Sequence, residues 1–397
     1  MKHVLLTTTL IFLISMTSQA GIVGGRKLFK FENKKDFESF WLTHARWNSA
    51  VGGVEAKFAE DGNKNIKTLA SSPIDNPYPS ALIESPVIEI GFPCSEIIVS
   101  WNAVTPLGSY LRVYVQTRSA GVWSKRFTVA IWSRESRADF RTSLRLQKDM
   151  FARMESDTLF ITKPADAFRV LAELSTRDGK TYPILKMLAV HALAKDSRPG
   201  RLRKHREVWG KDLLVPERSQ LTVPEGYRFC SATSTAMVLD WWAQKLGRPK
   251  LSVPLQTAVD GIYDKGWGGT GNWTFNTAYA AEFGGLKAYV TRLSSVSQIE
   301  QWIAKDVPVI VSLDYNILRG KAGRDMGHLM VIRGFTEEGD PIFNDPYTFL
   351  DKGECVRKVF PRSNFEASWL TEEGSKGTVY LIYPEGWEIP QNRYLDW

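Results

Sequence analysis

The stretch GYRFCSATSTAMVLDWW (residues 226–242) places a cysteine at the start of a segment with the apolar spacing of a buried helix. We expect this helix over residues 231–246, ended by Gly247 in the position after the last turn. Cys230 would then precede the first turn, where unpaired backbone N–H groups and the helix dipole lower a thiol pKa and favour the thiolate. Cys230 is therefore a candidate nucleophile, while a core residue and half of a disulfide stay open as alternatives.

A nucleophilic thiolate needs a base, and this half of the sequence holds a single histidine. His328 starts a predicted strand, where a histidine by itself is more often a polar edge residue. The strand paired with it ends in FNDP, so Asn344 and Asp345 return to the same end of the sheet. Neighbours on a strand point to opposite faces, so only one of them can orient the ring. For Asp345, an Asx turn into Pro346 is the structural alternative, and the two roles are compatible.

Helix signals come first in the rest of this half, and strand signals follow. A second helix is expected over residues 276–283, closed by Gly284 and Gly285, and a third is expected to start at Ser297 with Glu300 in a capping box. Strands are expected over residues 307–313, 328–335, 341–345 and 377–383. A helical lobe followed by an antiparallel sheet is an α+β arrangement.

The N-terminal half has a different pattern. Short segments rich in β-branched and aromatic residues cover residues 96–101, 109–117, 126–132, 157–162 and 167–175. They predict an all-β antiparallel sandwich over residues 27–194, which would serve as an accessory or binding domain. Trp101, Trp123 and Trp132 could stack on sugar rings if exposed, and packing inside the sandwich is the alternative that we favour.

Between the halves lies a basic segment. Residues 195–214 are polar, contain Pro199 and Gly200, and are expected to form a linker. A run of charge like this one is usually solvated, so nucleic-acid or lipid binding is the less favoured interpretation. Two domains joined by a linker also suit a length of 397 residues.

The overall composition is that of a globular protein, with 43% hydrophobic and 24% charged residues. The formal charge is +8, but no dense cluster of Lys and Arg interleaved with aromatic residues predicts a nucleic-acid partner. Attraction to anionic cell-wall polymers or lipid headgroups explains the same net positive charge. Cys94, Cys230 and Cys355 are too far apart for a metal knuckle, so no metal is expected, and one disulfide or none remains open.

The N-terminus has the features of a secretory signal peptide over residues 1–20. A basic Lys2 precedes an apolar run over residues 4–14, and the small residues Ser18 and Ala20 precede a plausible cleavage site. The run is too short for a convincing membrane span, and we expect no transmembrane segment in the mature chain. The protein is therefore expected to be exported, to the periplasm or the extracellular space.

Four segments of the C-terminal half carry a resemblance to a known family. RFCSATSTAMVLDWW, GTGNWTFNTAYAAEFGG, MGHLMVIRGF and FNDP resemble the papain-like bacterial cysteine peptidases related to the bacteriocin-processing (double-glycine leader) peptidases. The resemblance covers residues 215–383, within a peptidase domain expected over residues 215–390. It extends to the N-terminal half, because secreted relatives carry a similar β-rich domain. The implied fold is an α+β papain-like domain preceded by the sandwich.

The resemblance also implies roles for individual residues. Cys230 would attack the peptide carbonyl, His328 would act as the base, and Asp345 would orient it. Gln220, in PERSQ, would assist the oxyanion hole together with the backbone N–H of Cys230. The chain departs from the transporter-linked members at Ser231, where they have Gly, and in the longer spacing from the glutamine to the cysteine. Cleavage of leader peptides is therefore not implied.

Together these features predict a secreted cysteine peptidase that works through a Cys-His-Asp triad and an acyl-enzyme thioester, without a metal or organic cofactor. Its substrate would be a peptide or protein, with cell-wall peptides among the candidates. A transglutaminase-like acyltransferase and a noncatalytic surface-binding protein are the alternatives. The segment GGTGN (residues 268–272) lacks the Lys and Ser/Thr of a phosphate-binding loop and is expected to form one wall of the cleft.

Overall fold

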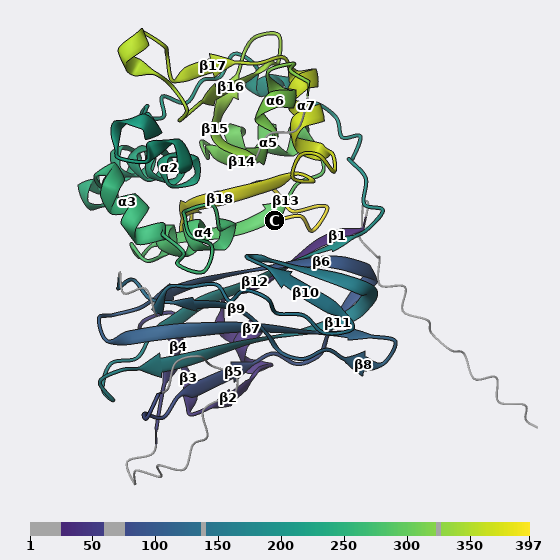
Figure 1. Ribbon diagram of the computed structural model, residues 1–397, viewed down its shortest axis with the longest axis vertical. Coiled ribbons are helices and arrows are strands. Elements are labelled where there is room, and N and C mark those ends of the chain that lie inside the picture. Colours follow the sequence, from purple (N-terminus) through teal and green to yellow (C-terminus); the bar gives the residue numbers. More distant parts are fainter. Residues whose placement is uncertain (1–24, 59–75, 136–139, 323–326) are drawn as a thin grey trace, which may run out of the picture.

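The computed structural model describes residues 25–58, 76–135, 140–322 and 327–397. A β-rich N-terminal half packs against a C-terminal half in which helices surround a second sheet (Figure 1). The predicted signal segment, residues 1–20, lies outside the described residues. No helix within the described ranges is long and apolar enough to cross a membrane.

The N-terminal half is built almost entirely from strands. In the described part of the chain, twelve strands and one short helix form it, and every strand pairing is antiparallel as predicted. The elements are β1 (Arg26–Phe31), α1 (Lys34–Glu38), β2 (Trp41–Thr43), β3 (Ala45–Asn48), β4 (Gly53–Ala56), β5 (Ala81–Glu84), β6 (Ile88–Val104), β7 (Ser109–Ser119), β8 (Val122–Trp123), β9 (Phe127–Trp132), β10 (Ala152–Glu155), β11 (Thr158–Thr176) and β12 (Ile184–Ala194).

Strand β11 joins two parts of this sheet. Its first residues pair with β6 and β10, and its later residues pair with β5 and β7. Register shifts between Phe160, Ala165 and Ala167 interrupt its ladder with β6, and such irregularities let a long strand bend and change partners. Phe168 of β11 meets Phe29 of β1, with ring centroids 5.1 Å apart. The sequence predicts two separate strands here, over residues 157–162 and 167–175, where the structure has the single strand β11.

Two of the three tryptophans considered for sugar binding are core residues. Trp101 and Trp132 are buried, and both rings pack edge-on against Phe275 of the C-terminal half, at centroid distances of 6.0 and 5.2 Å. Trp123 is half-buried, with the guanidinium groups of Arg118 and Arg169 over its ring. Trp101 and Trp132 therefore hold the two halves together and cannot stack on a sugar.

The C-terminal half contains a six-stranded antiparallel sheet within the described ranges, in the order β13-β18-β14-β15-β16-β17. Its strands are β13 (Leu286–Arg292), β14 (Val309–Leu313), β15 (His328–Phe335), β16 (Pro341–Asn344), β17 (Arg357–Val359) and β18 (Thr378–Pro384). Its helices are α2 (Cys230–Leu246), α3 (Leu255–Ile262), α4 (Trp273–Ala281), α5 (Val296–Ala304), α6 (Tyr315–Leu318) and α7 (Arg362–Leu370). Short 3-10 turns are η2 (Arg206–Val208), η3 (Gln220–Thr222), η4 (Gly226–Arg228), η5 (Pro249–Leu251) and η6 (Leu350–Lys352).

The helix ends differ from the predicted ones by a few residues. Helix α2 ends at Gly247, as predicted, with a φ of 61°, but Cys230 is already its first residue. Helix α4 starts three residues before the predicted Asn276, because the side chain of Asn272 accepts a hydrogen bond from Phe275 N and caps it.

The capping box of α5 was predicted at the wrong residues. The structure has it at Ser295 and Gln298 instead of Ser297 and Glu300. Glu300 is fully buried on this helix, where it accepts hydrogen bonds from His205 N, Trp209 Nε1 and Arg362 Nη1. Ser297 and Glu300 match the sequence pattern of a capping box. In the structure, however, Glu300 binds residues that are distant in sequence instead of the start of its own helix.

Strand β13 lies at one edge of the C-terminal sheet, and β6 of the other half covers that edge. The side chain of Asn102 donates to Ala288 O at 2.6 Å and accepts from Ala288 N at 3.1 Å. The hydroxyl of Ser100 accepts from Val290 N at 2.9 Å. Side chains of one half thus satisfy the open backbone groups of the other.

Candidate active site

Cys230 is the first residue of α2 and is partly buried. The N-cap residue, Phe229, offers no side-chain cap to the first turn, so the positive end of the helix is left to the thiol. Helix α2 is fixed to β15 by the hydroxyl of Ser234, which donates to Leu329 O at 3.1 Å. Because Leu329 follows His328, this contact sets Cys230 beside the start of β15.

His328 links the thiol to a carboxylate. Its buried ring lies close enough to the thiol of Cys230 for each group to shift the pKa of the other, and its Nε2 lies 2.8 Å from Asp345 Oδ1. Since Nε2 is engaged by Asp345, Nδ1 is the ring nitrogen left for the thiol. The ring of Tyr315 packs against the imidazole with centroids 4.5 Å apart. The structure thus brings together three of the four residues that the sequence analysis selected.

Asp345 is fully buried and has a complete set of donors. Oδ1 also accepts from Tyr347 N at 3.0 Å, while Oδ2 accepts from Tyr315 Oη at 2.6 Å and from Lys358 Nζ at 2.8 Å. Burial raises the pKa of this carboxyl, but His328 above all, followed by Lys358 and Tyr315, lowers it to about 2. The group is therefore an anion at neutral pH.

The same contacts shift the pKa values of the thiol and the imidazole in opposite directions. Burial lowers the pKa of His328, yet Asp345 and Cys230 outweigh it and raise this pKa to about 9. Burial raises the pKa of Cys230, yet the hydrogen bond and charge of His328 and the N–H groups of Leu329 and Ser231 bring it below its usual value. Both shifts favour a thiolate and an imidazolium over a neutral thiol and a neutral imidazole.

Asn344 points away from this cluster, as strand alternation predicts. Its side-chain oxygen accepts from Arg333 Nη1 at 3.0 Å, and its amide group donates to Val215 O and Pro216 O. Asn344 therefore ties the segment before η3 to the sheet. Of the two neighbours, only Asp345 contacts the imidazole.

Gln220 is buried in η3, on the segment that leads to Cys230. Its Nε2 donates to Gly226 O at 2.8 Å, and its backbone N donates to Pro346 O at 2.9 Å. Its Oε1 has no hydrogen-bond partner in the described part of the chain. The structure therefore places Gln220 between the loop before Cys230 and the residue after Asp345, and no hydrogen bond joins it to Cys230 in the described part of the chain.

Tyr315 and Lys358 are the members of the cluster that the sequence analysis missed. Tyr315 opens the four-residue helix α6, and Lys358 lies on β17, opposite Phe343 of β16. Neither is adjacent in sequence to Cys230, His328 or Asp345, and no motif marks them. The only feature of the sequence that could have pointed to Lys358 is its basic side chain on β17, the strand that pairs with β16 before Asp345.

The glycine-rich segment lies beside the approach to Cys230. Nη2 of Arg228 donates to Gly268 O at 2.6 Å, so the turn is held two residues before the cysteine. The N-terminal half supports the same turn, because Ser143 N donates to the buried Asp264 at 2.8 Å. The side chain of Trp267 is exposed on this turn. These contacts place the segment beside the turn that precedes Cys230, and its role as a wall of the cleft stays a prediction.

The remaining cysteines have other surroundings. Cys94 is buried within β6, and burial raises the pKa of its thiol to about 12. Cys355 is exposed. All three thiols are free, so the disulfide that the sequence left open is not formed. Within the described ranges, no cluster of three or more His, Cys, Asp or Glu side chains could hold a metal ion.

Comparisons with known proteins match both halves of the chain. The family model described as Peptidase C39 N-terminal domain matches residues 28–192, and the one described as Peptidase C39 like family matches residues 213–376. No curated protein sequence matches. A crystal structure described as a C39-like peptidase from Bacillus anthracis is 18% identical, with a TM-score of 0.32, over 43% of this chain and 97% of that one.

Proposed function

We propose that this chain, which belongs to a C39-related peptidase family, is a cysteine peptidase that hydrolyses peptide bonds through Cys230, His328 and Asp345. The observation that carries the proposal is the position of His328, which contacts the thiol on one side and the buried carboxylate on the other. A nucleophile, a base and a group that orients the base are what acyl transfer needs.

In the proposed reaction the Cys230 thiolate attacks the carbonyl carbon, and a C–S bond forms while an electron pair moves to the oxygen. Protonated His328 gives its proton to the leaving amine as the C–N bond breaks, which leaves a thioester. Neutral His328 then takes a proton from the water that attacks the thioester. Release of the acid returns the thiolate and the imidazolium.

The oxyanion of each step would be held by the backbone N–H of Cys230 and the side chain of Gln220. The Nε2 of Gln220 carries two hydrogens, and Gly226 O occupies one of them at 2.8 Å. The second hydrogen is the proposed donor to the developing negative charge. Asp345, which Tyr315 and Lys358 hold in place, would keep the imidazole oriented throughout.

Three further features belong to the proposal. The fold would be papain-like, with the nucleophile at a helix N-terminus and the histidine on an antiparallel sheet. The β-rich half would be a sandwich with an accessory role. Export to the periplasm or beyond would follow from residues 1–20, and the substrate would be a peptide or protein met there, with cell-wall peptides included.

The first test measures the activation of the thiol. The purified full chain is treated with dilute iodoacetamide at about pH 6, and the labelled peptides are mapped by mass spectrometry. Cys230 should react well before the exposed Cys355 and the buried Cys94, which serve as internal controls. The His328→Ala variant should lose this preference while keeping its melting temperature. Equal labelling of Cys230 and Cys355 in both proteins would contradict the proposal.

The second test measures cleavage. A peptide library is incubated with the wild type and with Cys230→Ala, which keeps the fold and lacks the nucleophile. New peptide N-termini that only the wild type produces would support hydrolysis. Incorporation of an added primary amine without cleavage would indicate transglutaminase-like transfer. An activated thiol with neither product would favour a noncatalytic binding protein.

A further inference from the structure

The basic linker between the halves is held in a fixed position instead of being loosely solvated. The buried side chain of Arg26 donates to Arg198 O at 3.1 Å, and Gly200 N donates to Ser294 O at 2.7 Å. A side chain in place of the hydrogen of Gly200 would meet the hydroxyl of Ser294 at 2.8 Å. The linker backbone therefore lies tightly against the C-terminal half.

The same contact continues along the linker. Ser297 of α5 donates its hydroxyl to Leu202 O at 3.3 Å, and His205 N donates to Glu300 at 2.8 Å. Both ends of the basic run are thus tied to the N-terminal turns of α5. Because the backbone is fixed at these points, it loses no further conformational entropy when a ligand binds, and only the exposed side chains have to be ordered.

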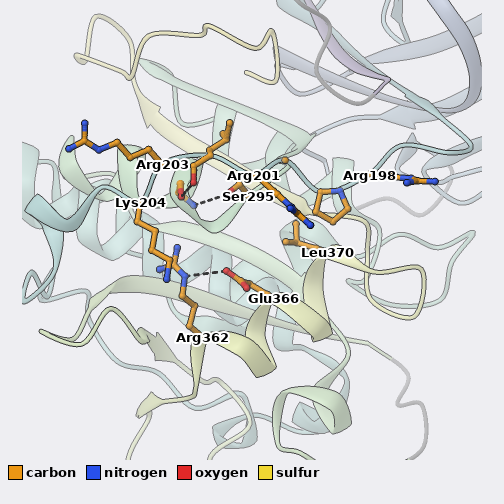
Figure 2. A pocket seen from close by; sticks show the side chains of 12 residues that line it. Arg198, Arg201, Arg203, Lys204, Ser295, Arg362, Glu366 and Leu370 are labelled. Carbon is orange, nitrogen blue, oxygen red and sulfur yellow. Dashed lines mark hydrogen bonds and ion pairs between the residues drawn. The ribbon is translucent and has the colours of Figure 1, made fainter.

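The linker side chains border a pocket of about 830 Å³ between the linker, the start of α5, and α7. Figure 2 shows the side chains around it. Five of the lining residues are cationic: Arg198, Arg201, Arg203, Lys204 and Arg362. One lining carboxylate, Glu366, belongs to the described residues, and it already pairs with Arg362 at 3.1 Å. The pocket shares no residue with the Cys230 site.

Arg362, on α7, is the cation of the pocket that is held by ion pairs. Its Nη1 binds the buried Glu300 at 2.7 Å, and its Nε binds Glu366. The structure records no acceptor for its Nη2 in the described part of the chain. Likewise, the four linker cations form no hydrogen bond or ion pair with a carboxylate in the described ranges, although Arg203 interacts electrostatically with the exposed Glu207. Like charges gathered on a fixed backbone repel one another, and a bound anion relieves that repulsion.

We propose that this pocket is a binding site for a soluble anion with two or more phosphate groups. Guanidinium groups bind phosphate oxygens in pairs, and several of them around one cavity can share a chain of phosphates. Nothing in this inference depends on the peptidase reaction.

The lining favours this ligand over two others. Among the described residues that line the pocket, Pro199, Leu202 and Leu370 are apolar and none is aromatic. Single-stranded nucleic acids are held by stacking of bases on aromatic side chains, which this lining lacks. Membrane surfaces are held by apolar side chains inserted beside the basic ones, and neither leucine is strongly exposed.

The test titrates tripolyphosphate into the full chain by calorimetry at about 0.15 M salt. Binding of one ligand per chain is expected, and the double variant Arg201→Ala/Lys204→Ala should weaken it at least tenfold. The matched control is Lys195→Ala/Arg206→Ala, which removes two exposed cations of the same linker that do not line the pocket. This control should change the affinity less than twofold.

A third variant tests the opposite change. Glu366→Gln removes the lining carboxylate and should strengthen tripolyphosphate binding severalfold. Absence of binding to the wild type, or equal weakening by both double variants, would overturn the proposal.

A vesicle experiment separates the possible sources of phosphate. Sedimentation with phosphatidylglycerol vesicles should leave the protein in the supernatant. Binding to vesicles without binding to tripolyphosphate would also overturn the proposal, since it would make the surface a membrane contact. Labelling of Cys230 by iodoacetamide should be the same in all four proteins. Loss of anion binding can thus be told apart from failure of the proposed peptidase.

Discussion

At the scale of single residues, the environment of His328 decides the chemistry of the site. The imidazole lies between the thiol of Cys230 and the carboxylate of Asp345, and both partners favour its charged form. The raised pKa of His328 and the lowered pKa of Cys230 leave a pH interval in which both groups are ionised. Within this interval, the proposed nucleophile and the proposed proton donor would both be in their reactive forms before a substrate binds.

We therefore expect a bell-shaped dependence of kcat/KM on pH. Activity should rise with pH as the Cys230 thiol ionises, below its usual pKa, and should fall as His328 loses its proton near pH 9. The measurement is the cleavage rate of a fluorogenic peptide from pH 4 to 10. An activity that keeps rising above pH 9 would show that a neutral imidazole is the active form.

The second prediction separates the two neighbours at the end of β16. Asp345→Ala should lower kcat about a hundredfold or more and move the alkaline limb of the pH profile to lower pH, because the carboxylate that raises the pKa of His328 is gone. Asn344→Ala should mainly lower the melting temperature, since it leaves the buried Arg333 with one acceptor fewer. An unshifted alkaline limb in Asp345→Ala would contradict the assigned role.

Gln220 allows a test of the proposed oxyanion donor. Gln220→Ala should lower kcat roughly ten- to a thousandfold with little change in KM, because the hydrogen bond strengthens mainly in the transition state. Alkylation of Cys230 by iodoacetamide forms no oxyanion and should proceed at the wild-type rate. If alkylation slows as much as cleavage, Gln220 acts by shaping the loop through its bond to Gly226.

At the scale of elements, the turn η4, just before Cys230, is packed too tightly to accept a side chain at Gly226. A Cβ atom on Gly226 would lie 1.9 Å from the backbone oxygen of Gln220. Turns η3 and η4 are therefore pressed together, and the entry of the chain into α2 depends on a glycine that a local pattern does not mark.

Gly226→Ala should accordingly separate η3 from η4, lower the melting temperature and reduce cleavage at least tenfold. The matched control is Gly247→Ala at the other end of α2, where the φ is 61° and a Cβ would meet nothing within 4 Å. That change should cost about 1 kcal/mol through backbone strain and leave kcat unchanged. Equal effects of the two variants on kcat would mean that η4 does not position Cys230.

At the scale of the whole molecule, the two halves form a single structural unit. Asn102 and Ser100 of β6 cover the free edge of β13, and Trp101 and Trp132 pack on Phe275 of α4. The N-terminal half also supports the turn beside the active site through Ser143. We infer that the C-terminal half alone would expose an unpaired strand edge and an aromatic surface.

Asn102→Ala tests this coupling. The change leaves both the N–H and the C=O of Ala288 buried without partners, which should lower the free energy of unfolding by about 2–4 kcal/mol. Denaturant unfolding followed by tryptophan fluorescence and by circular dichroism should show one shared transition at a lower midpoint. Two separated transitions in the wild type would contradict a single cooperative unit.

The sequence by itself determined the local features of this protein. Apolar periodicity and a glycine located α2 and its end, and the alternation of strand residues separated Asn344 from Asp345. Strand patterns located eight of the eighteen strands in the described part of the chain: β6, β7, β9, β11, β14, β15, β16 and β18. The resemblance pointed to Cys230, His328 and Asp345. These signals succeed because helix and strand geometry act over a few residues, so the pattern and the structure that it specifies lie in the same segment.

Only the tertiary structure decided the contacts between distant segments. It brought Tyr315 and Lys358 to the carboxylate of Asp345, placed Trp101 and Trp132 between the halves, moved the capping box of α5 to Ser295, and fixed the basic linker around a pocket. No local pattern carries such contacts, because each depends on which surfaces of separate elements meet when the core closes. Burial and pairing across the sheets then override the propensities of single segments.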